Sequence, residues 1–243
     1  MPRKKTSVPL TTSNSPAKQA AEDDAKTRLL WAALEVFAKS GFEATTTRML
    51  ASKAGVNLSA IPYYFGSKEG LYHAVIQMLT DRIRAHMQAG IAEAEALLAK
   101  DSVSRREVLE LLGKMLPGPI ILFTGPYADF IGPIVANEQQ QPTSAFPILY
   151  DGYIRIVHEL GTRLVARYLG IAADSPEAVI RTHALAGQMF IFLGARATIL
   201  RRLGENVISE QNVKLIQRVI AEQSQATLLG LDLILSQKKE ENS

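Results

Sequence analysis

Glycines divide the first 66 residues of this 243-residue chain into segments too short to fold alone. Gly41, Gly55 and Gly66 separate stretches in which apolar residues repeat every three or four positions. That spacing predicts short amphipathic helices over about residues 25–41, 47–54 and 58–65. Because helices of this length cannot each bury an apolar face alone, the three must pack on one another.

The apolar residues of these segments have the spacing of one shared core. Its predicted members are Phe37, Phe42, Leu50, Ala51, Ala54, Val56, Ile61, Phe65 and Leu71. Ala51 and Gly55 suit the close approach of two helices, and Gly55 can adopt the left-handed conformation of a tight turn at low cost. The pattern indicates a helix-turn-helix.

The residues left outside this core suit DNA. Thr46 is placed to cap the second helix, with Thr47 and Arg48 in its first turn, where exposed amides attract a phosphate oxygen. Asn57 is placed to cap the third helix, whose outward residues are small or aromatic and suit the major groove. These outward residues are Leu58, Ser59, Ala60, Pro62 and Tyr63.

Tyr64 and Lys68 come next, and we expect both to reach the phosphate backbone beyond the groove. Each of these assignments has a plainer alternative. Tyr63 and Tyr64 can be core aromatics, and packing is the expected role of Phe65. Arg48 and Lys68 can be solvated surface charges.

Two runs of sequence carry a family resemblance. Residues 44–56 read Ala-Thr-Thr-Thr-Arg-Met-Leu-Ala-Ser-Lys-Ala-Gly-Val, and residues 61–72 read Ile-Pro-Tyr-Tyr-Phe-Gly-Ser-Lys-Glu-Gly-Leu-Tyr. Together they resemble the DNA-binding domain of the TetR family of transcriptional regulators. The resemblance implies a homodimer on a double-stranded palindromic operator, repression by default, and release by a small-molecule effector bound in the C-terminal domain.

Pro62 departs from that family's pattern, which commonly has tyrosine or another hydrogen-bond donor there. Proline has no amide proton to donate to the carbonyl of Leu58, so a distorted turn is predicted. The departure also puts in doubt the phosphate contact that the family pattern implies at this position. Ile61, Tyr64 and Phe65 still match, so the helix itself remains expected.

The rest of the chain continues the helical pattern, and no alternating strand pattern or phosphate-binding loop occurs. A long helix is expected over residues 68–100. Prolines and glycines between 117 and 133 predict short or kinked pieces. Longer helices are expected over 146–169, 176–202 and 209–236. The predicted fold is all-α: a three-helix DNA-binding domain followed by a larger helical domain for ligand binding and dimerisation.

The C-terminal part resembles the CecR branch of the family at residues 182–200 and 137–146. Helix 176–202 is apolar on more than one face and helix 209–236 has a long apolar stripe, so burial on two sides is expected. A four-helix interface between two copies of the chain would bury the second side of each helix. A monomer whose own core covers both faces is the alternative.

Helices interrupted by proline and glycine cannot pack as regular rods, so a largely apolar effector cavity is expected in this domain. The candidate lining residues are Phe123, Phe130, Tyr153, His183, Gln188 and Phe190. Ordinary core packing is the alternative for each of them.

Charge is unevenly distributed along the chain. Residues 1–68 contain ten Lys and Arg and five Asp and Glu, whereas the remainder contains seventeen and nineteen. A basic end joined to a nearly neutral body is typical of nucleic-acid binding. The predicted domains are a disordered basic arm (1–22), the helix-turn-helix domain (23–70), the ligand-binding and dimerisation domain (71–236) and a charged tail (237–243). The arm either contacts DNA or is a solvated tail.

The sequence lacks cysteine, a signal-peptide pattern and an apolar run long enough to span a membrane, so we expect a cytoplasmic protein. The four histidines have no metal-ligand spacing, and no nucleophile motif occurs, so neither an enzyme nor a cofactor or metal is expected. The alternatives to a repressor are an activator of the same fold and a ligand-binding protein that no longer binds DNA.

Overall fold

The computed structural model describes residues 16–120 and 128–241. Within these ranges every regular element is an α-helix, apart from the π-helical turn η1 (Tyr150–Ile154). The predicted all-α fold is confirmed. Phe123 lies outside the described residues.

Three helices form the N-terminal end, which we call the reader: α1 (Pro16–Ala44), α2 (Thr47–Ala54) and α3 (Ala60–Phe65). They pack with the start of α4 (Lys68–Leu98) around a buried core. Of the predicted core, six residues are buried and the other three are partly buried against them. The buried six are Phe37, Leu50, Ala51, Ala54, Ile61 and Leu71; the partly buried three are Phe42, Val56 and Phe65.

The turn between α2 and α3 forms as the sequence predicts. Gly55 has φ 63° and ψ 38°, in the left-handed region that glycine adopts without strain. The Val56 amide then donates to the Ala51 carbonyl. Gly41, with φ 73°, interrupts α1 at the predicted position, although helical geometry resumes as far as Ala44.

The first helix begins earlier than predicted. We expected residues 16–22 to belong to a disordered arm, but their backbone lies in α1. Pro16 stands at the first helical position, where its fixed φ suits a helix start, and Ala17, Ala20 and Ala21 are strong helix formers. The disorder predicted for residues 1–15 concerns a segment outside the described residues.

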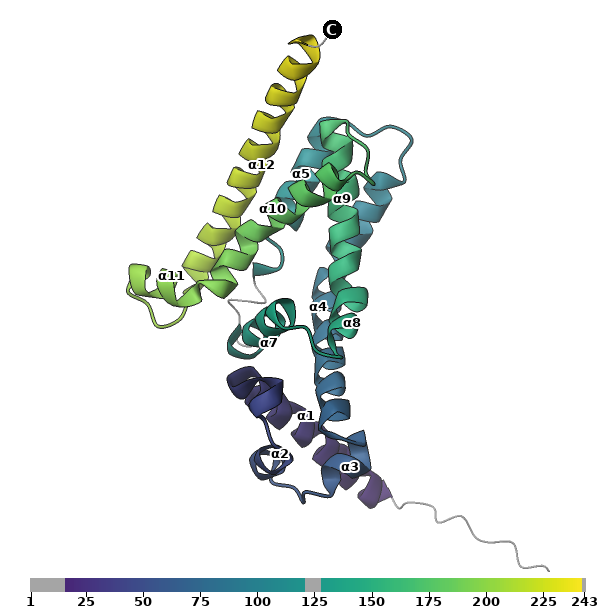
Figure 1. Cartoon of the computed structure of the whole chain (residues 1–243), viewed down its shortest axis with the longest axis vertical. Helices are drawn as coiled ribbons and strands as arrows, with labels where there is room; N and C mark the ends of the chain where they lie inside the picture. Colours follow the sequence, from purple (N-terminus) through teal and green to yellow (C-terminus); the bar gives the residue numbers. More distant parts are fainter. Residues whose placement is uncertain (1–15, 121–127, 242–243) are drawn as a thin grey trace, which may run out of the picture.

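The second part, which we call the body, lies along the upper half of α4 and extends to its left (Figure 1). Its helices are α5 (Arg105–Met115), α7 (Ala128–Gln140), α8 (Phe146–Leu149), α9 (Arg155–Leu169), α10 (Pro176–Gly194), α11 (Arg196–Leu203) and α12 (Glu210–Glu241). A second buried cluster joins α4, α5, α9 and α12 through residues such as Leu97, Leu112, Leu164 and Leu228. α12 extends beyond the other helices at its C-terminal end (Figure 1).

The single helix predicted over 176–202 is wrong. The chain bends by 66° between α10 and α11. Ala195 leaves helical geometry at φ −113° and ψ 30°, directly after Gly194, and Arg196 forms an ion pair with Asp129 of α7 at 3.3 Å. No single described helix is long and apolar enough to cross a membrane, and only this bent pair passes by composition.

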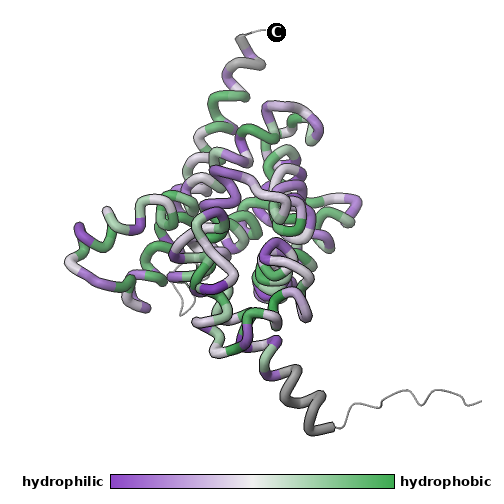
Figure 2. Tube along the Cα trace, turned by 60° about the horizontal axis from the view of Figure 1, so that its bottom comes forward, coloured by the Kyte–Doolittle hydropathy of each residue, from purple (hydrophilic) through white to green (hydrophobic). Residues whose placement is uncertain are grey.

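Helix α12 continues through residues 237–241, which belong to the predicted charged tail. Hydrophobic segments alternate with polar ones along the projecting part of α12 (Figure 2). The helix therefore carries apolar side chains beyond the part that the body covers.

Candidate DNA interface and effector cavity

The N-terminus of α2 has the predicted cap. Thr46 is extended at φ −105° and ψ 154°, and its hydroxyl accepts from the Met49 amide at 3.3 Å. Thr46 and Arg48 are exposed and Thr47 is half-buried. Among the described residues, Arg48 has no ion-pair partner. The first turn of α2 therefore offers a free cation and a helix N-terminus on the same surface.

Asn57 acts before α3 rather than at its first turn. Its Oδ1 accepts from the Ser59 amide and from the Ser59 hydroxyl, both at 3.0 Å. The helix begins at Ala60, two residues later than predicted, and Ser59 at its N-cap position makes no side-chain cap. The asparagine thus holds the turn that leads into α3.

Pro62 does not break α3. The Leu58 carbonyl, which a normal residue 62 would bond, accepts from the Ile61 amide at 3.4 Å instead. The next amide, that of Tyr63, donates to the Ser59 carbonyl at 3.1 Å. A tighter i to i+3 bond therefore replaces the one that proline removes.

The outward side of this segment is accessible. Leu58 is 45% exposed and Tyr63 is 69% exposed. Ser59 and Pro62 are exposed as well, and Ala60 is half-buried.

Tyr64 is half-buried and packs against the reader core, while its ring stands edge-on to Tyr63 with centroids 4.8 Å apart. Its alternative role as a packing residue is therefore the one that the geometry favours.

Lys68 makes contacts within the reader that we did not expect. Its Nζ donates to the carbonyls of Phe42 and Thr45 at 3.0 and 3.1 Å, and it lies 4.2 Å from the centre of the Phe42 ring. The ammonium therefore adds a donor to carbonyls at the end of α1, of which that of Phe42 also accepts from the Thr45 amide. A half-buried lysine with these partners stabilises the reader, and its contact with a phosphate stays a prediction.

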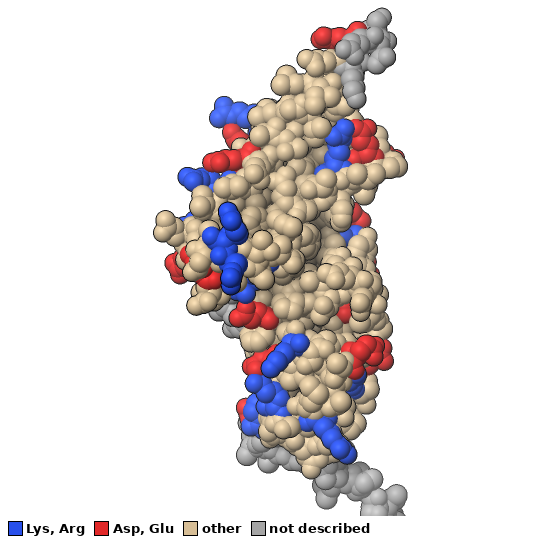
Figure 3. Space-filling model, turned by 60° about the vertical axis from the view of Figure 1, so that its left-hand side comes forward, with Lys and Arg blue, Asp and Glu red and all other residues tan. Residues whose placement is uncertain are grey.

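Basic side chains occur on the reader surface. On the face shown in Figure 3, Lys and Arg gather at the lower end, which the reader helices form. Among the described side chains of the reader, the exposed basic residues are Lys26, Arg28, Lys39, Arg48 and Lys53. Two of these are neutralised by ion pairs, Arg28 with Asp24 and Lys53 with Glu35.

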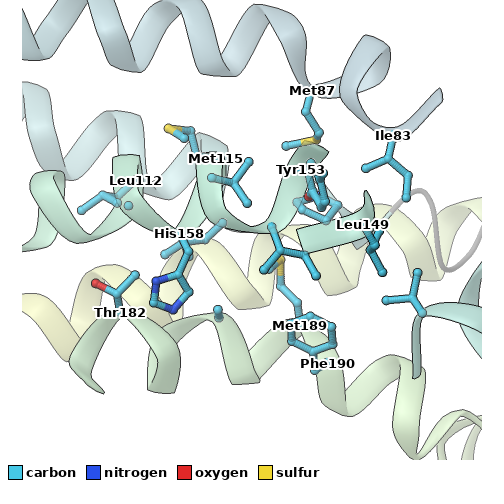
Figure 4. A pocket seen from close by; sticks show the side chains of 17 residues that line it. Ile83, Met87, Leu112, Met115, Leu149, Tyr153, His158, Thr182, Met189 and Phe190 are labelled. Carbon is cyan, nitrogen blue, oxygen red and sulfur yellow. The ribbon is translucent and has the colours of Figure 1, made fainter. Parts of the chain in front are cut away.

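The body contains a cavity of about 110 Å³ between α4, α5, α7, α9 and α10. Its wall is almost entirely apolar, with methionine on three different helices (Figure 4). The residues that dominate it are Ile83, Met87, Leu112, Met115, Val135, Leu149, Ile154, Val157, Ala186, Met189 and Phe190. Such a wall suits a nonpolar ligand, and flexible methionines allow it to change shape.

Three polar side chains face the cavity: Tyr153, His158 and Thr182. His158 and Thr182 lie together at one end (Figure 4). Burial, and secondarily the nearby charge of His183, lower the pKa of His158, so its imidazole is neutral at pH 7. Burial likewise raises the pKa of the Tyr153 phenol, which remains protonated. The cavity therefore offers polar groups without a net charge.

The predicted lining residues fall into two groups. Tyr153 and Phe190 line the cavity. Phe130 packs instead against the buried cluster that includes the reader core. Gln188 accepts from the Ser224 hydroxyl at 3.3 Å. His183 is exposed, with its ring centroid 5.7 Å from that of His158.

Sequence reasoning missed His158 and the methionines. The placement of Met87, Met115 and Met189 on three separate helices was the available signal, but only the tertiary packing brings them together.

A buried hydrogen bond joins the reader to the body, and sequence reasoning did not find it either. The Tyr72 hydroxyl of α4 donates to Glu138 of α7 at 2.6 Å, and the Glu138 side chain is fully buried. The Thr143 hydroxyl and amide also donate to Glu138. Burial, then the bond to Glu138 and its charge, raise the pKa of Tyr72. The Tyr72 ring packs edge-on against Phe37, so this contact reaches the reader core.

Family models match two parts of the chain. Residues 29–75 match the model of bacterial regulatory proteins of the tetR family, and residues 106–231 match the C-terminal domain of the HTH-type transcriptional dual regulator CecR. The chain is 34% identical over 218 residues to the HTH-type transcriptional dual regulator CecR of Shigella flexneri, covering 90% of this chain and 97% of that protein.

Solved structures share the fold. The Bacillus subtilis regulator FadR in complex with stearoyl-CoA superposes with a TM-score of 0.55 at 15% identity, covering 82% of this chain and 96% of that one. AibR in complex with isovaleryl coenzyme A and operator DNA gives a TM-score of 0.52 at 13% identity, covering 70% of this chain and 86% of that one. These relatives are regulators and not enzymes.

Proposed function

Because the chain belongs to the TetR family of transcriptional regulators and has a CecR-type C-terminal domain, we propose that it is a repressor released from a palindromic operator by a small molecule. One observation carries this proposal. Helix α4 is continuous from the reader core, where Leu71 and Val75 are buried, to the cavity wall, where it contributes Ile83 and Met87. A ligand that displaces the wall therefore acts on the helix that positions the reader.

A homodimer is part of the proposal. Ile180 and Ile191 of α10, three turns apart, are 67% and 59% exposed, and Leu229 and Leu233 of α12, one turn apart, are 50% and 67% exposed. Apolar rows on two neighbouring helices suit a two-fold four-helix interface. Such a dimer places two copies of α3 on successive turns of one DNA face. It acts on bacterial DNA and so in the cytoplasm.

The proposed effector is largely apolar where it is buried. A cavity of about 110 Å³ is smaller than the roughly 300–1,000 Å³ of sites for drug-sized ligands. A drug-sized effector must therefore push the cavity wall outward. It then binds the expanded conformation more tightly than the DNA-binding one, and this difference in affinity is what release requires. Acyl chains have this chemistry, and the structural relatives FadR and AibR are complexes with stearoyl-CoA and isovaleryl coenzyme A.

Helix α7 offers a second route from the cavity to the reader. Val135 lines the cavity, and Glu138, one turn later, bonds Tyr72 beside the reader core. A ligand that shifts Val135 therefore strains or breaks the Glu138–Tyr72 bond. This arrangement supports release by a change in how the reader sits on the body.

The test is a fluorescence anisotropy titration of the full chain with DNA from upstream of its own gene. We expect specific binding that weakens about 1,000-fold between roughly 50 and 200 mM salt if about six phosphates are contacted. No binding at low salt to any neighbouring promoter would contradict DNA regulation. A promoter reporter in cells that lack the gene distinguishes a repressor from an activator. Reporter expression rises if the protein is a repressor and falls if it is an activator.

Light scattering of the Leu233→Glu variant tests the dimer. We expect a monomer with weaker operator affinity, because a buried carboxylate opposes the interface. Leu203→Glu is the matched control, since Leu203 is also exposed but lies on α11. A dimeric Leu233→Glu protein would contradict the proposed interface.

A further inference from the structure

The outward surface of α3 and the turn before it is unusually poor in groups that hydrogen-bond to bases. Leu58 and Pro62, four residues apart, share one exposed side, and Ser59 and Tyr63 share the next. Leu58 is 45% exposed although it is a large apolar residue in a structured segment. No Arg, Lys or Gln occurs between Asn57 and Phe65.

Three polar groups at the start of this surface are engaged within the protein: the Ser59 amide, the Ser59 hydroxyl and Asn57 Oδ1. The Ser59 hydroxyl donates to Asn57 Oδ1, and the Ser59 amide donates to the same atom. Both therefore lack a free proton for a base acceptor, unless the turn is rearranged. Pro62 has no amide proton at all. Beside the Asn57 side-chain NH2 and the Tyr63 hydroxyl, which can still hydrogen-bond, this surface presents the hydrocarbon of Leu58 and Pro62.

The major groove presents one apolar group, the 5-methyl of thymine. We propose that Leu58 and Pro62 are specificity-determining residues that read thymine through its methyl group. The proposal rests on the proposed function, in which α3 enters the major groove. It assigns Pro62 a direct role: a proline ring offers hydrocarbon where a tyrosine would offer a hydrogen-bond donor.

The experiment compares two versions of one operator. A fragment protected by the protein in footprinting is synthesised with thymine and again with uracil in place of every thymine, which removes only the methyl groups. We expect affinity to fall about fourfold for each buried methyl, and about 15-fold when each half-site of a dimer contributes one. Anisotropy titrations of the full chain measure this thymine-to-uracil ratio.

Variants identify which residues make the contact. Leu58→Ala and Pro62→Ala should each bring the ratio closer to one, and both positions are exposed, so the fold should survive, as circular dichroism will check. Arg48→Ala is the matched control: it should weaken binding to both fragments by the same factor.

Three results would contradict the inference or its premise, each in a different way. Equal affinity for the two fragments, with specific binding retained, overturns methyl readout and leaves DNA regulation intact. A ratio that is unchanged in both alanine variants shows that the methyls act through DNA shape, which also overturns it. If footprinting yields no protected fragment near the gene, that result contradicts the proposed function itself.

Discussion

The reader and the body are both helical, but their interiors are built differently. The reader core contains large side chains with almost no exposed area, among them Leu34, Phe37, Leu50 and Ile61, each at 0 to 1%. The body surrounds a cavity of about 110 Å³ with methionines on three helices. A tightly packed core holds one geometry, whereas flexible thioether side chains tolerate several.

This contrast matches the two tasks of a ligand-controlled regulator. A surface that recognises DNA must keep its side chains in place, because misplacement weakens every contact at once. A domain that responds to a ligand needs a second arrangement close in free energy. α4 and the Glu138–Tyr72 bond connect the two parts.

The largest expected effect comes from opening the reader core. Leu50→Ala should cost about 2–5 kcal/mol of unfolding free energy, because Leu50 is fully buried. Chemical denaturation measures it. Met189→Ala at the cavity wall is the comparison and should cost less, since part of that side chain already faces empty space. Equal costs would show that the two interiors are not different in packing.

The second largest effect is expected from removing the Glu138–Tyr72 hydrogen bond between the reader and the body. Tyr72→Phe keeps the ring against Phe37 but removes the donor to buried Glu138, which should cost about 2 kcal/mol. Calorimetry should then show the reader unfolding before the body. Tyr150→Phe is the control, because Tyr150 is exposed. An unchanged single transition would mean that the bond does not couple the parts.

A smaller change in stability should accompany filling the cavity. Ala186→Leu places three more carbons into it, so stability should change by less than about 1.5 kcal/mol while ligand binding is lost. Benzene, which occupies an engineered cavity of about 150 Å³ in another protein, is the probe. It should raise the melting temperature of the native chain and of the exposed control Ala89→Leu, but not of Ala186→Leu. Stabilisation of all three would place the benzene site elsewhere.

The smallest expected effect is a dependence on pH in the body. The folded chain holds the pKa of His158 below its usual value, so the unfolded chain takes up a proton first as pH falls. Stability should therefore decline from about pH 6.5 downward to the folded pKa of His158. His158→Gln should reduce this decline in denaturation curves measured at several pH values. A native-like slope in that variant would assign it to other groups.

The sequence predicted most of the reader, because its structure follows from local rules. Glycines at the turns, threonine at the cap of α2 and apolar residues at helical spacing each act within a few residues of themselves. In the body, helix positions were predictable but the split between α10 and α11 was not. At that bend Arg196 forms an ion pair with Asp129 of another helix, a contact that the local sequence does not reveal.

The sequence by itself indicated the part of the reading surface on α3, since Pro62 and Tyr63 directly follow buried Ile61 and are exposed. Leu58 and Ser59 lie in the turn before the helix and are exposed there. Tertiary structure alone decided the partners of Lys68, the methionine wall of the cavity and the Glu138–Tyr72 bond. The residues of the last pair are 66 positions apart in the chain. Periodicity describes which face of a helix is apolar, but only the packed chain decides what that face meets.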